Sequence, residues 1–328
     1  MPSAVLIDTD PGIDDAVALA LAARLPELAI VGITTCHGNT DVARATRNAR
    51  EVARRVGIDA PITAGAPAPL RRAAHPARET HGDEGLGHWI PDQAAHAEPD
   101  HAAQVIAEAV GANHRLTLIC LGPLTNLARA IGEFDHIAHG LGPIFIMGGT
   151  VGVRGTQTRW SEFNWWGDPE AVAAVLNAGL DLRIVPLDVT RRIVVPGAAV
   201  RALREAGESD SDARFWGDAL GFYMDFHRGH EGLDGCVVND PLAVALAANP
   251  SLATWRDMRI GISVSDDERR GAIVLDADAG ASARIAMTVL AEEVLALMTH
   301  HVFSPWLSEG LVRQGAAAAT RWLEDHPQ

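Results

Sequence analysis

Residues 4–15 read AVLIDTDPGIDD, and the expected fold can be built outward from them. The apolar run Ala4–Ile7 is short and aliphatic, as is typical of a buried strand. From Asp14, an Ala- and Leu-rich helical pattern runs to Leu25, which predicts a helix soon after the strand. A strand that passes through a polar turn into a helix is the first half of a βαβ unit.

The same alternation of strands and helices continues along the chain. Further strands are expected at Ala29–Thr35, Pro61–Ala64, Leu116–Leu121, Pro143–Met147 and Leu182–Pro186, and helices at Asp41–Val56, from about Leu124, at Pro169–Ala178 and within 207–235. Residues 258–264, 271–275 and 285–289 predict strands, with an antiparallel edge, and helices follow from Ala291. We therefore predict an α/β fold with an open, mostly parallel, Rossmann-like sheet and helices on both faces.

No Pro-rich or Gly/Ser-rich linker separates apolar halves of the chain, so we expect one domain over residues 1–328. Residues 71–99 interrupt the pattern, because they have no periodicity. They hold His75, His81, His88 and His96 among Gly, Pro and Asp. Loops of this length in compact domains are usually functional lids or mobile segments. We therefore expect an active-site lid there.

Polar residues or glycine-containing turns follow most of the expected strands. They are Asp8, Asp10, Asn39, Gly122 to Asn126, Gly148-Gly149 and Asp188. In open α/β sheets, ligands bind outside the carboxyl ends of the strands. We therefore expect these residues to converge on one crevice, which would be rich in carboxylate and amide oxygens.

The first strand end carries four carboxylates within eight residues, at Asp8, Asp10, Asp14 and Asp15. Like charges in one crevice repel, so at neutral pH the cluster needs a cation or shared protons. Carboxylate oxygens favour a hard ion such as Ca²⁺, whereas Zn²⁺ would favour His or Cys nearby. An EF-hand loop that starts at Asp8 fails, because Gly12 and Leu19 occupy two of its ligand positions.

The chain is acidic, with a formal net charge of −15, and all 27 basic residues are Arg. An acidic surface repels nucleic acid and anionic membranes, so we expect neither as a partner. The absence of Lys excludes a Schiff-base mechanism.

Cys36, Cys120 and Cys236 are far apart and form no CxxC motif, which fits free thiols in the cytoplasm. An acidic residue at position 8 argues against a signal peptide, and no apolar run reaches the roughly 18 residues of a membrane helix.

The segment DTDPGIDDA at residues 8–16 closely resembles the N-terminal signature of the nucleoside hydrolase family, of the inosine-uridine-preferring type. Further matching blocks are Thr34-Thr35 leading to Gly38-Asn39, GPLTNLA at 122–128, Met147-Gly148-Gly149, Glu162-Phe163-Asn164, Asp168-Pro169-Glu170-Ala171 and Asp240-Pro241-Leu242-Ala243-Val244. The resemblance implies the family's fold and hydrolysis of ribonucleosides to ribose and free base, in nucleoside catabolism and salvage. It also implies a homodimer or homotetramer.

Carried over by position, the resemblance implies roles for individual residues. One Ca²⁺ would be held by Asp10, Asp15, Asp240 and the backbone carbonyl of Thr125. Asp10 would deprotonate the water that this ion activates. Contacts with the ribose would come from Asp14, Asn39, Glu162 and Asn164, with Met147 and Phe163 as further candidates.

The chain departs from the family pattern where the base leaves. Relatives commonly carry a His before the DPLAV block, and this chain has Asn239, whose amide cannot release a proton. Tyr223 and His227 stand where many relatives carry two active-site tyrosines, and their i,i+4 spacing places them on one helix face. His81 resembles a lid His that lies over the base in pyrimidine-preferring relatives. We expect His227 or His81 to protonate the leaving base, and all four residues to contact it.

Two alternatives remain open at this point. A non-catalytic nucleoside- or ribose-binding relative would keep the metal cluster and have lost the acid, as Asn239 suggests. A DxD phosphatase is much less favoured, because Gly12 stands where that motif needs Thr or Val and the chain has no Lys. Capping of a helix by Asp14 and Asp15 would explain those two acids but not the pair before them.

Overall fold

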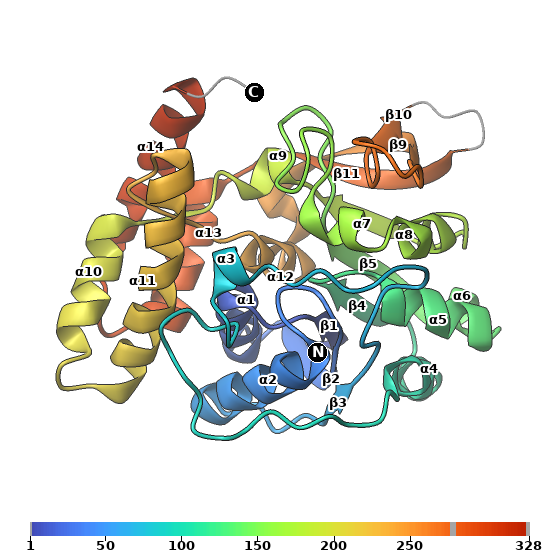
Figure 1. Cartoon of the computed structure of the whole chain (residues 1–328), viewed down its shortest axis with the longest axis horizontal. Coiled ribbons are helices and arrows are strands. Elements are labelled where there is room, and N and C mark those ends of the chain that lie inside the picture. The colour runs from blue at the N-terminus through green and yellow to red at the C-terminus, as the bar shows by residue number, and fades with distance from the viewer. Residues whose placement is uncertain (1, 276–279, 326–328) are drawn as a thin grey trace.

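The computed structural model describes residues 2–275 and 280–325 (Figure 1). In these residues, nine strands form one sheet: β1 (Ser3–Thr9), β2 (Leu28–Thr35), β3 (Ile62–Ala64), β4 (Leu116–Cys120), β5 (Leu141–Met147), β6 (Leu182–Val185), β9 (Ala253–Ile262), β10 (Ile273–Leu275) and β11 (Ala281–Val289). Their order across the sheet is β10-β9-β11-β6-β5-β4-β1-β2-β3. The strands β7 (Val194–Pro196) and β8 (Gly235–Val237) form a separate antiparallel pair.

The strand pairs from β11 to β3 are parallel, and β9 pairs antiparallel with both β11 and β10. The predicted parallel sheet with an antiparallel edge is therefore confirmed. From β1, the chain adds β2 and β3 on one side, then crosses to β4 and continues to β6 on the other. The gap between the carboxyl ends of β1 and β4 is thus the topological switch point, where such sheets bind ligands.

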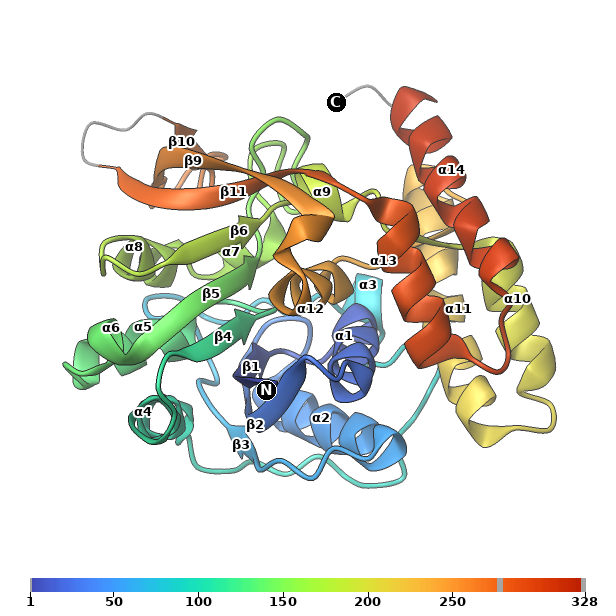
Figure 2. The ribbon, with the colours of Figure 1, turned by 180° about the vertical axis from the view of Figure 1, so that it is seen from behind.

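Helices connect the strands and cover both faces of the sheet (Figures 1 and 2). They are α1 (Ile13–Arg24), α2 (Val42–Val56), α3 (Arg78–His81), α4 (Ala102–Ala112), α5 (Thr125–Glu133), α6 (Ile137–Gly140), α7 (Phe163–Gly167), α8 (Pro169–Leu176), α9 (Leu187–Thr190), α10 (Gly197–Ala206), α11 (Ser211–Glu231), α12 (Asp240–Ala248), α13 (Ala291–Met298) and α14 (Glu309–Asp325). The sequence pattern did not predict α4, α10 or the β7–β8 pair. In the described part of the chain, no helix combines the length and the apolarity needed to cross a bilayer.

Strand side chains alternate between two apolar layers. In β1, Val5 and Ile7 pack in one layer with α1, α12 and α13, whereas Leu6 packs in the other with α4, α5 and α8. Phe145 and Ile146 in β5 divide between the same two layers. This period of two is what a sheet covered on both faces requires.

The helix α1 is apolar on nearly every side, and every residue from Ile13 to Ala22 is buried. It packs between the sheet and a lobe that contains α10, α11, α13 and α14, seen at the left of Figure 1. Its first turn, however, carries two buried acids, Asp14 and Asp15. Negative charge is favourable at a helix N-terminus, so the fold delivers two carboxylates to the switch point.

Candidate active site

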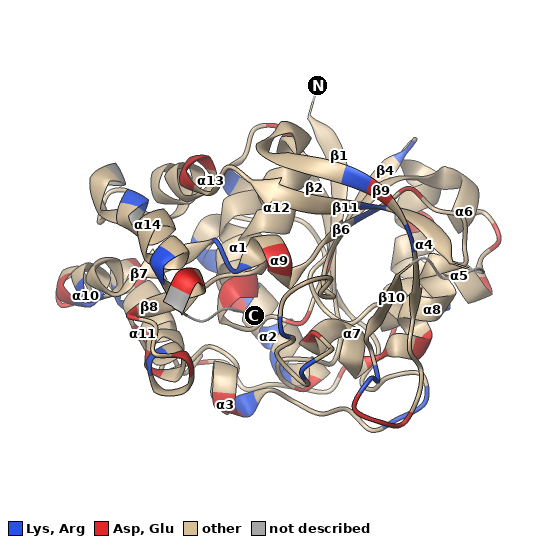
Figure 3. Ribbon diagram, turned by 90° about the horizontal axis from the view of Figure 1, so that it is seen from above, with Lys and Arg blue, Asp and Glu red and all other residues tan. Residues whose placement is uncertain are grey.

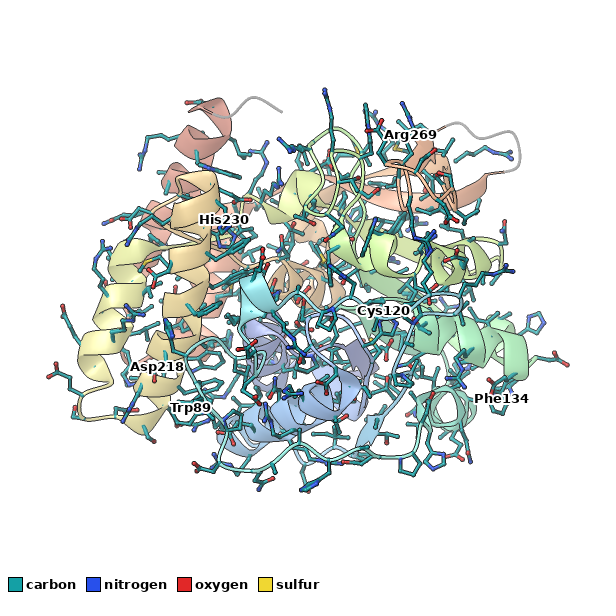
Figure 4. The ribbon with its side chains drawn as sticks, viewed as in Figure 1. Trp89, Cys120, Phe134, Asp218, His230 and Arg269 are labelled. Carbon is teal, nitrogen blue, oxygen red and sulfur yellow. The ribbon has the colours of Figure 1, made fainter. Side chains whose placement is uncertain are left out.

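Residues that follow different strands meet at the switch point. The backbone N–H of Asn39, beyond β2, donates to Asp10 Oδ2 at 2.7 Å. The side-chain amide of Asn164 donates to the carbonyl of Leu121, beyond β4, at 2.7 Å and lies beside Met147 at the end of β5. In Figure 4, Cys120 marks the carboxyl end of β4 near the middle of the molecule. The carboxyl ends of β1, β2, β4 and β5 therefore converge as expected, whereas Asp188, after β6, accepts from the backbone N–H groups of Val151 and Gly152.

Three carboxylates gather where the N-termini of α1 and α12 meet. Ligand oxygens of Asp14, Asp15 and Asp240 all lie within 4.8 Å of one another, and the three side chains are buried. Burial raises the pKa of Asp240 well above its ordinary value, and repulsion from Asp14 and Asp15 raises it further. The group therefore favours a bound cation or retained protons at neutral pH.

Asp10 lies near these three carboxylates without being one of the set, and its charge adds to the repulsion on Asp240. Its Oδ1 is buried and has no hydrogen-bond partner among the described residues. A methyl group at Gly38 would lie 1.8 Å from Asp10 Oδ2, and one at Gly122 would lie 2.4 Å from Oδ1. The carboxylate is thus closely flanked by two glycines, and one oxygen is left for a ligand.

Asp15 and Asp14 differ in how firmly they are held. Asp15 accepts hydrogen bonds from the Thr9 hydroxyl at 2.5 Å, and from Gly12 N and the Asn39 amide, each at 2.9 Å. Asp14 Oδ2 accepts longer bonds, from the Asn239 backbone N–H at 3.2 Å, its side-chain amide at 3.3 Å and the Tyr223 hydroxyl at 3.4 Å. Asp15 is fixed in place, whereas Asp14 has weaker partners that a ligand hydroxyl could replace.

The donor set fits a hard cation, because the predicted ligands offer oxygen atoms only. Thr125, the first residue of α5, commits its hydroxyl to Asp168 Oδ2 at 2.7 Å and to His37 Nε2 at 2.9 Å. A ligand role for Thr125 would therefore fall to its main-chain carbonyl. Oxygen-only sites suit Ca²⁺ better than Zn²⁺.

A second wall of the site is built on α7. Glu162 caps this helix: its carboxylate accepts from Asn164 N at 2.7 Å, Gly149 N at 2.9 Å and Trp165 N at 3.1 Å. Burial raises the pKa of Glu162 to about 7, although these three donors act to lower it. Phe163 is half-buried and lines a small cavity beside Gly38 and Pro123. Polar atoms of α7 are therefore held rigidly beside the cluster.

A third wall contains two histidines, Tyr223 and Asn239. The ring centroids of His81 and Tyr223 are 5.3 Å apart, and those of Tyr223 and His227 are 4.5 Å apart. Asn239 accepts from the Thr190 hydroxyl at 2.8 Å. Burial lowers the pKa of His81 to about 4, and it also lowers that of His227. The four residues predicted at the base end thus form one group around Asp14.

Buried polar residues support the site from behind, and the sequence pattern assigned no role to two of them, His37 and Asp168. Asp8 is the third. Its Oδ1 accepts from the Thr34 hydroxyl at 2.6 Å and the Asn126 amide at 2.8 Å, and burial raises its pKa to about 6. His37 and Asp168 together fix the Thr125 side chain. The position of Asp168 at a helix start could have been predicted, since Asp followed by Pro marks such a start. No sequence pattern pointed to His37.

A profile of the family described as inosine-uridine preferring nucleoside hydrolase matches residues 5–296. The chain is 33% identical over 280 residues to the pyrimidine-specific ribonucleoside hydrolase RihA of Photobacterium profundum, covering 84% of this chain and 89% of that protein. It is also 33% identical over 281 residues to the inosine-uridine preferring nucleoside hydrolase of Leishmania major, with 84% and 88% covered.

Solved structures give the same result. The plant nucleoside hydrolase PpNRh1 is similar with a TM-score of 0.86 at 30% sequence identity, covering 93% of this chain and 100% of that one. The purine-preferring ribonucleoside hydrolase from Gardnerella vaginalis is similar with a TM-score of 0.83 at 25% identity, covering 97% and 100%. The similarity therefore extends over nearly the whole fold, and the family match over residues 5–296 includes the residues of the site.

Proposed function

The chain belongs to the inosine-uridine preferring nucleoside hydrolase family and hydrolyses ribonucleosides. We propose that it does so with one Ca²⁺ and with Asp10 as the general base. The observation that carries this proposal is the buried, unpartnered Oδ1 of Asp10 beside three further carboxylates. A lone pair in such a place is costly unless a cation or a proton donor occupies the site.

Asp10, Asp15, Asp240 and the main-chain carbonyl of Thr125 would hold the ion. When bound, Ca²⁺ supplies charge that lowers the pKa of a coordinated water and orients it. Its binding also relieves the repulsion among the carboxylates, which contributes to their raised pKa values.

Asp10 would accept the proton of the attacking water at Oδ1. Its other oxygen is already fixed by the Asn39 N–H, so the carboxylate cannot turn away. Burial and the neighbouring Asp15 raise the pKa of Asp10, which makes this carboxylate a stronger base than an exposed Asp.

The ribose would lie between the carboxylate cluster and α7. Hydroxyl groups would be bound by Asp14, Asn39, Glu162 and Asn164, and Met147 and Phe163 would contact the sugar's carbon face. Breaking the N-glycosidic bond leaves positive charge on the sugar, which buried carboxylates stabilise. The base would then lie against His81, Tyr223, His227 and Asn239, and one of the two histidines would protonate it.

A nucleoside panel tests the proposal directly. Purified enzyme with Ca²⁺ should release free base and reducing sugar from at least one purine or pyrimidine ribonucleoside, and chelation followed by Ca²⁺ addition should abolish and restore this activity. The D10N variant keeps an oxygen ligand but cannot accept a proton, so turnover should fall by at least about 10²-fold while ribose-like inhibitors still bind. Normal turnover in D10N would refute the general-base role.

We further propose a cytoplasmic homodimer or homotetramer. Cys36, Cys120 and Cys236 are buried free thiols, as a reducing compartment permits. Light scattering coupled to size-exclusion chromatography would measure the number of copies, and a monomer would refute the assembly.

A further inference from the structure

The proposed reaction needs an acid that protonates the departing base, and His81 and His227 are the two candidates. The hydrogen bonds around the two rings distinguish them. Both rings are buried, at 5% exposure each, and both flank Tyr223. A general acid must carry a second proton before the reaction and release it to the base. The question is therefore which imidazole has room for two N–H groups.

His81 has no room for a second proton. Its Nδ1 accepts a hydrogen bond from the backbone N–H of Ile13 at 3.1 Å. A proton on Nδ1 would place two N–H donors against each other, so the bond holds the ring neutral with its hydrogen on Nε2. Loss of that remaining proton would leave an imidazolate anion, which is inaccessible near neutral pH. His81 can donate a hydrogen bond but cannot deliver a proton.

His227 has the opposite arrangement. Its Nδ1 lies 2.8 Å from the carbonyl oxygen of Tyr223, which can only accept, so Nδ1 carries a hydrogen. The lone pair of the neutral ring is then on Nε2. A second proton can be added there without breaking any hydrogen bond.

An acidic side chain stands beside Nε2 of His227. Glu231 lies one helical turn further along α11, and its Oε2 is 3.9 Å from Nε2. That oxygen is buried and has no hydrogen-bond partner among the described residues. An unpaired carboxylate oxygen next to a ring nitrogen favours the imidazolium form.

Other charged groups also face His227 from the surrounding elements. Asp14 at the start of α1 favours its protonated form, and Arg191 after α9 opposes it. His81 on α3 is also close enough to interact. Burial has the largest effect on the pKa of His227 and lowers it, and among the charged groups Glu231 opposes this effect most, ahead of Asp14.

We propose that His227 is the acid that protonates the departing base, that Glu231 is the positioning residue that favours its imidazolium form, and that His81 only donates a hydrogen bond. This inference rests on the proposed hydrolase mechanism. As the bond from C1′ to the base nitrogen breaks, its electron pair goes to the base, and the base takes the Nε2 proton of His227. The ring keeps its Nδ1 hydrogen on the Tyr223 carbonyl and later regains a proton from solvent.

The test compares a natural nucleoside with p-nitrophenyl riboside, whose leaving group needs little protonation. In H227N, the amide can still donate to the Tyr223 carbonyl, but the Nε2 position is lost. We expect kcat for the nucleoside to fall at least about 10²-fold and kcat for the activated substrate to fall less than about 10-fold. In H81N, the side-chain oxygen can still accept from Ile13, and we expect equal changes on both substrates.

The E231Q variant tests the positioning role through the pH profile. Because kcat of an acid-catalysed step falls as the acid deprotonates, removal of the carboxylate should move the falling limb for the nucleoside to lower pH by about one unit.

Two matched controls lie on α11. His230, labelled in Figure 4, makes the same bond to a carbonyl one turn back but is exposed, and Asp225 is an exposed acid. H230N and D225N should change neither the ratio of kcat for the two substrates nor the pH at which kcat for the nucleoside falls.

Each outcome decides between the two proposals. If the wild-type enzyme cleaves neither substrate, the proposed function fails. If it cleaves both but H227N loses equally on both, or H81N alone shows the selective loss, the assignment of the acid is overturned while the function stands. If the falling limb of the pH profile stays at the same pH in E231Q, Glu231 has no positioning role. Circular dichroism and thermal melting would identify variants that are misfolded.

Discussion

Gly122 shows how a residue without a side chain shapes the site. An added Cβ there would lie 2.4 Å from Asp10 Oδ1, the oxygen proposed to receive the proton. That distance is too short for any contact between a carbon and an oxygen, so the carboxylate would have to turn. Its partner Asn39 N–H opposes such a turn, because it holds the other oxygen at 2.7 Å.

We expect G122A to lose at least about 10²-fold in kcat, because a displaced general base works poorly. The G132A variant is the matched control, since a Cβ at Gly132 on α5 would meet no atom within 4 Å. This control should leave activity unchanged and stabilise α5 by up to about 1 kcal/mol. Steady-state kinetics and chemical denaturation measure both effects, and a fully active G122A would contradict the proposed position of the base.

Single residues of the site could be predicted only where a motif names them. The four acids of residues 8–15 were visible because carboxylates rarely gather without a ligand. The role of His37 could not be predicted, since its contact with Thr125 joins positions 88 residues apart in the chain. The tautomers of His81 and His227 were equally out of reach, because they depend on which backbone groups the folded rings meet.

At the scale of elements, α3 and the start of α1 are joined by one side chain. His81 ends α3, and its Nδ1 accepts from Ile13 N, a group that the first turn of a helix leaves without an intrahelical partner. A Cβ on Gly12 would come within 2.6 Å of the same ring. The 71–99 segment, predicted to be a lid, therefore touches α1 through His81.

We expect H81A to free this segment while the rest of the fold stays intact. Backbone amides of residues 78–89 should exchange with deuterium at least about 10-fold faster, since loss of a buried hydrogen bond and its packing costs on the order of 1–3 kcal/mol. H75A is the control, because His75 contacts Trp166 rather than α1. Equal exchange in wild type and H81A would show that the segment is held by other contacts.

The elements predicted from sequence were those with a strong local pattern. The strands β1, β2, β4 and β5 and the helices α1, α2 and α8 all lie within a few residues of their predicted bounds. The pair β7–β8 was missed because each strand has three residues, and each is defined only by the other, about 40 positions away. Such short segments carry too little periodicity to indicate a strand.

At the scale of the whole molecule, the proposed ion would link two parts of the fold that are far apart in the sequence. Asp10 and Asp15 follow β1, whereas Asp240 begins α12 more than two hundred residues later. A ligand that binds the folded state only stabilises it by mass action. Calcium should therefore protect the entire fold and not only the loop that holds it.

We expect Ca²⁺ at 100 times its dissociation constant to raise the free energy of unfolding by about 2.7 kcal/mol. The shift in Tm should disappear in D240N, which removes one charge from the cluster. A control variant, D257N, removes an exposed acid on β9 and should keep the full shift. Differential scanning calorimetry with and without chelator measures it, and an unshifted wild-type Tm would argue against a calcium site.

The pH dependence of stability should show a contribution from His37. Burial lowers its pKa from 6.5 to about 4, so between these values the unfolded chain binds a proton that the folded chain does not. The contribution of His37 is therefore complete above pH 6.5 and is lost as the pH falls towards 4, by at most about 3 kcal/mol. Buried carboxyls with raised pKa, such as Glu162, act in the opposite direction, so the quantity to measure is a difference.

The matched variant is H37Q, whose amide can still donate to Thr125 but does not titrate. The stability of wild type relative to H37Q, from urea denaturation at several pH values, should fall as the pH is lowered from 6.5 to 4. A constant difference across this range would contradict the assigned pKa shift.

Charged residues are spread along the outer helices and loops of the ribbon, with acids and arginines interspersed (Figure 3). Many of the arginines pair with acids, as Arg55 does with both Glu51 and Asp212. The net charge of −15 therefore comes from an excess of acids around such pairs and from the buried cluster. A neutral nucleoside meets little repulsion from this surface, whereas a polyanion would be repelled.

Within residues 2–275 and 280–325, the nine-stranded sheet ends on both sides in a strand of three residues, β3 and β10. An outermost strand exposes unpaired N–H and carbonyl groups, and a long one invites a strand from another molecule to pair with it. Strands this short offer a neighbour only one or two hydrogen bonds. The enzyme therefore carries built-in protection against amyloid-like association, even though its core strands, if exposed, would be among the most aggregation-prone segments of the chain.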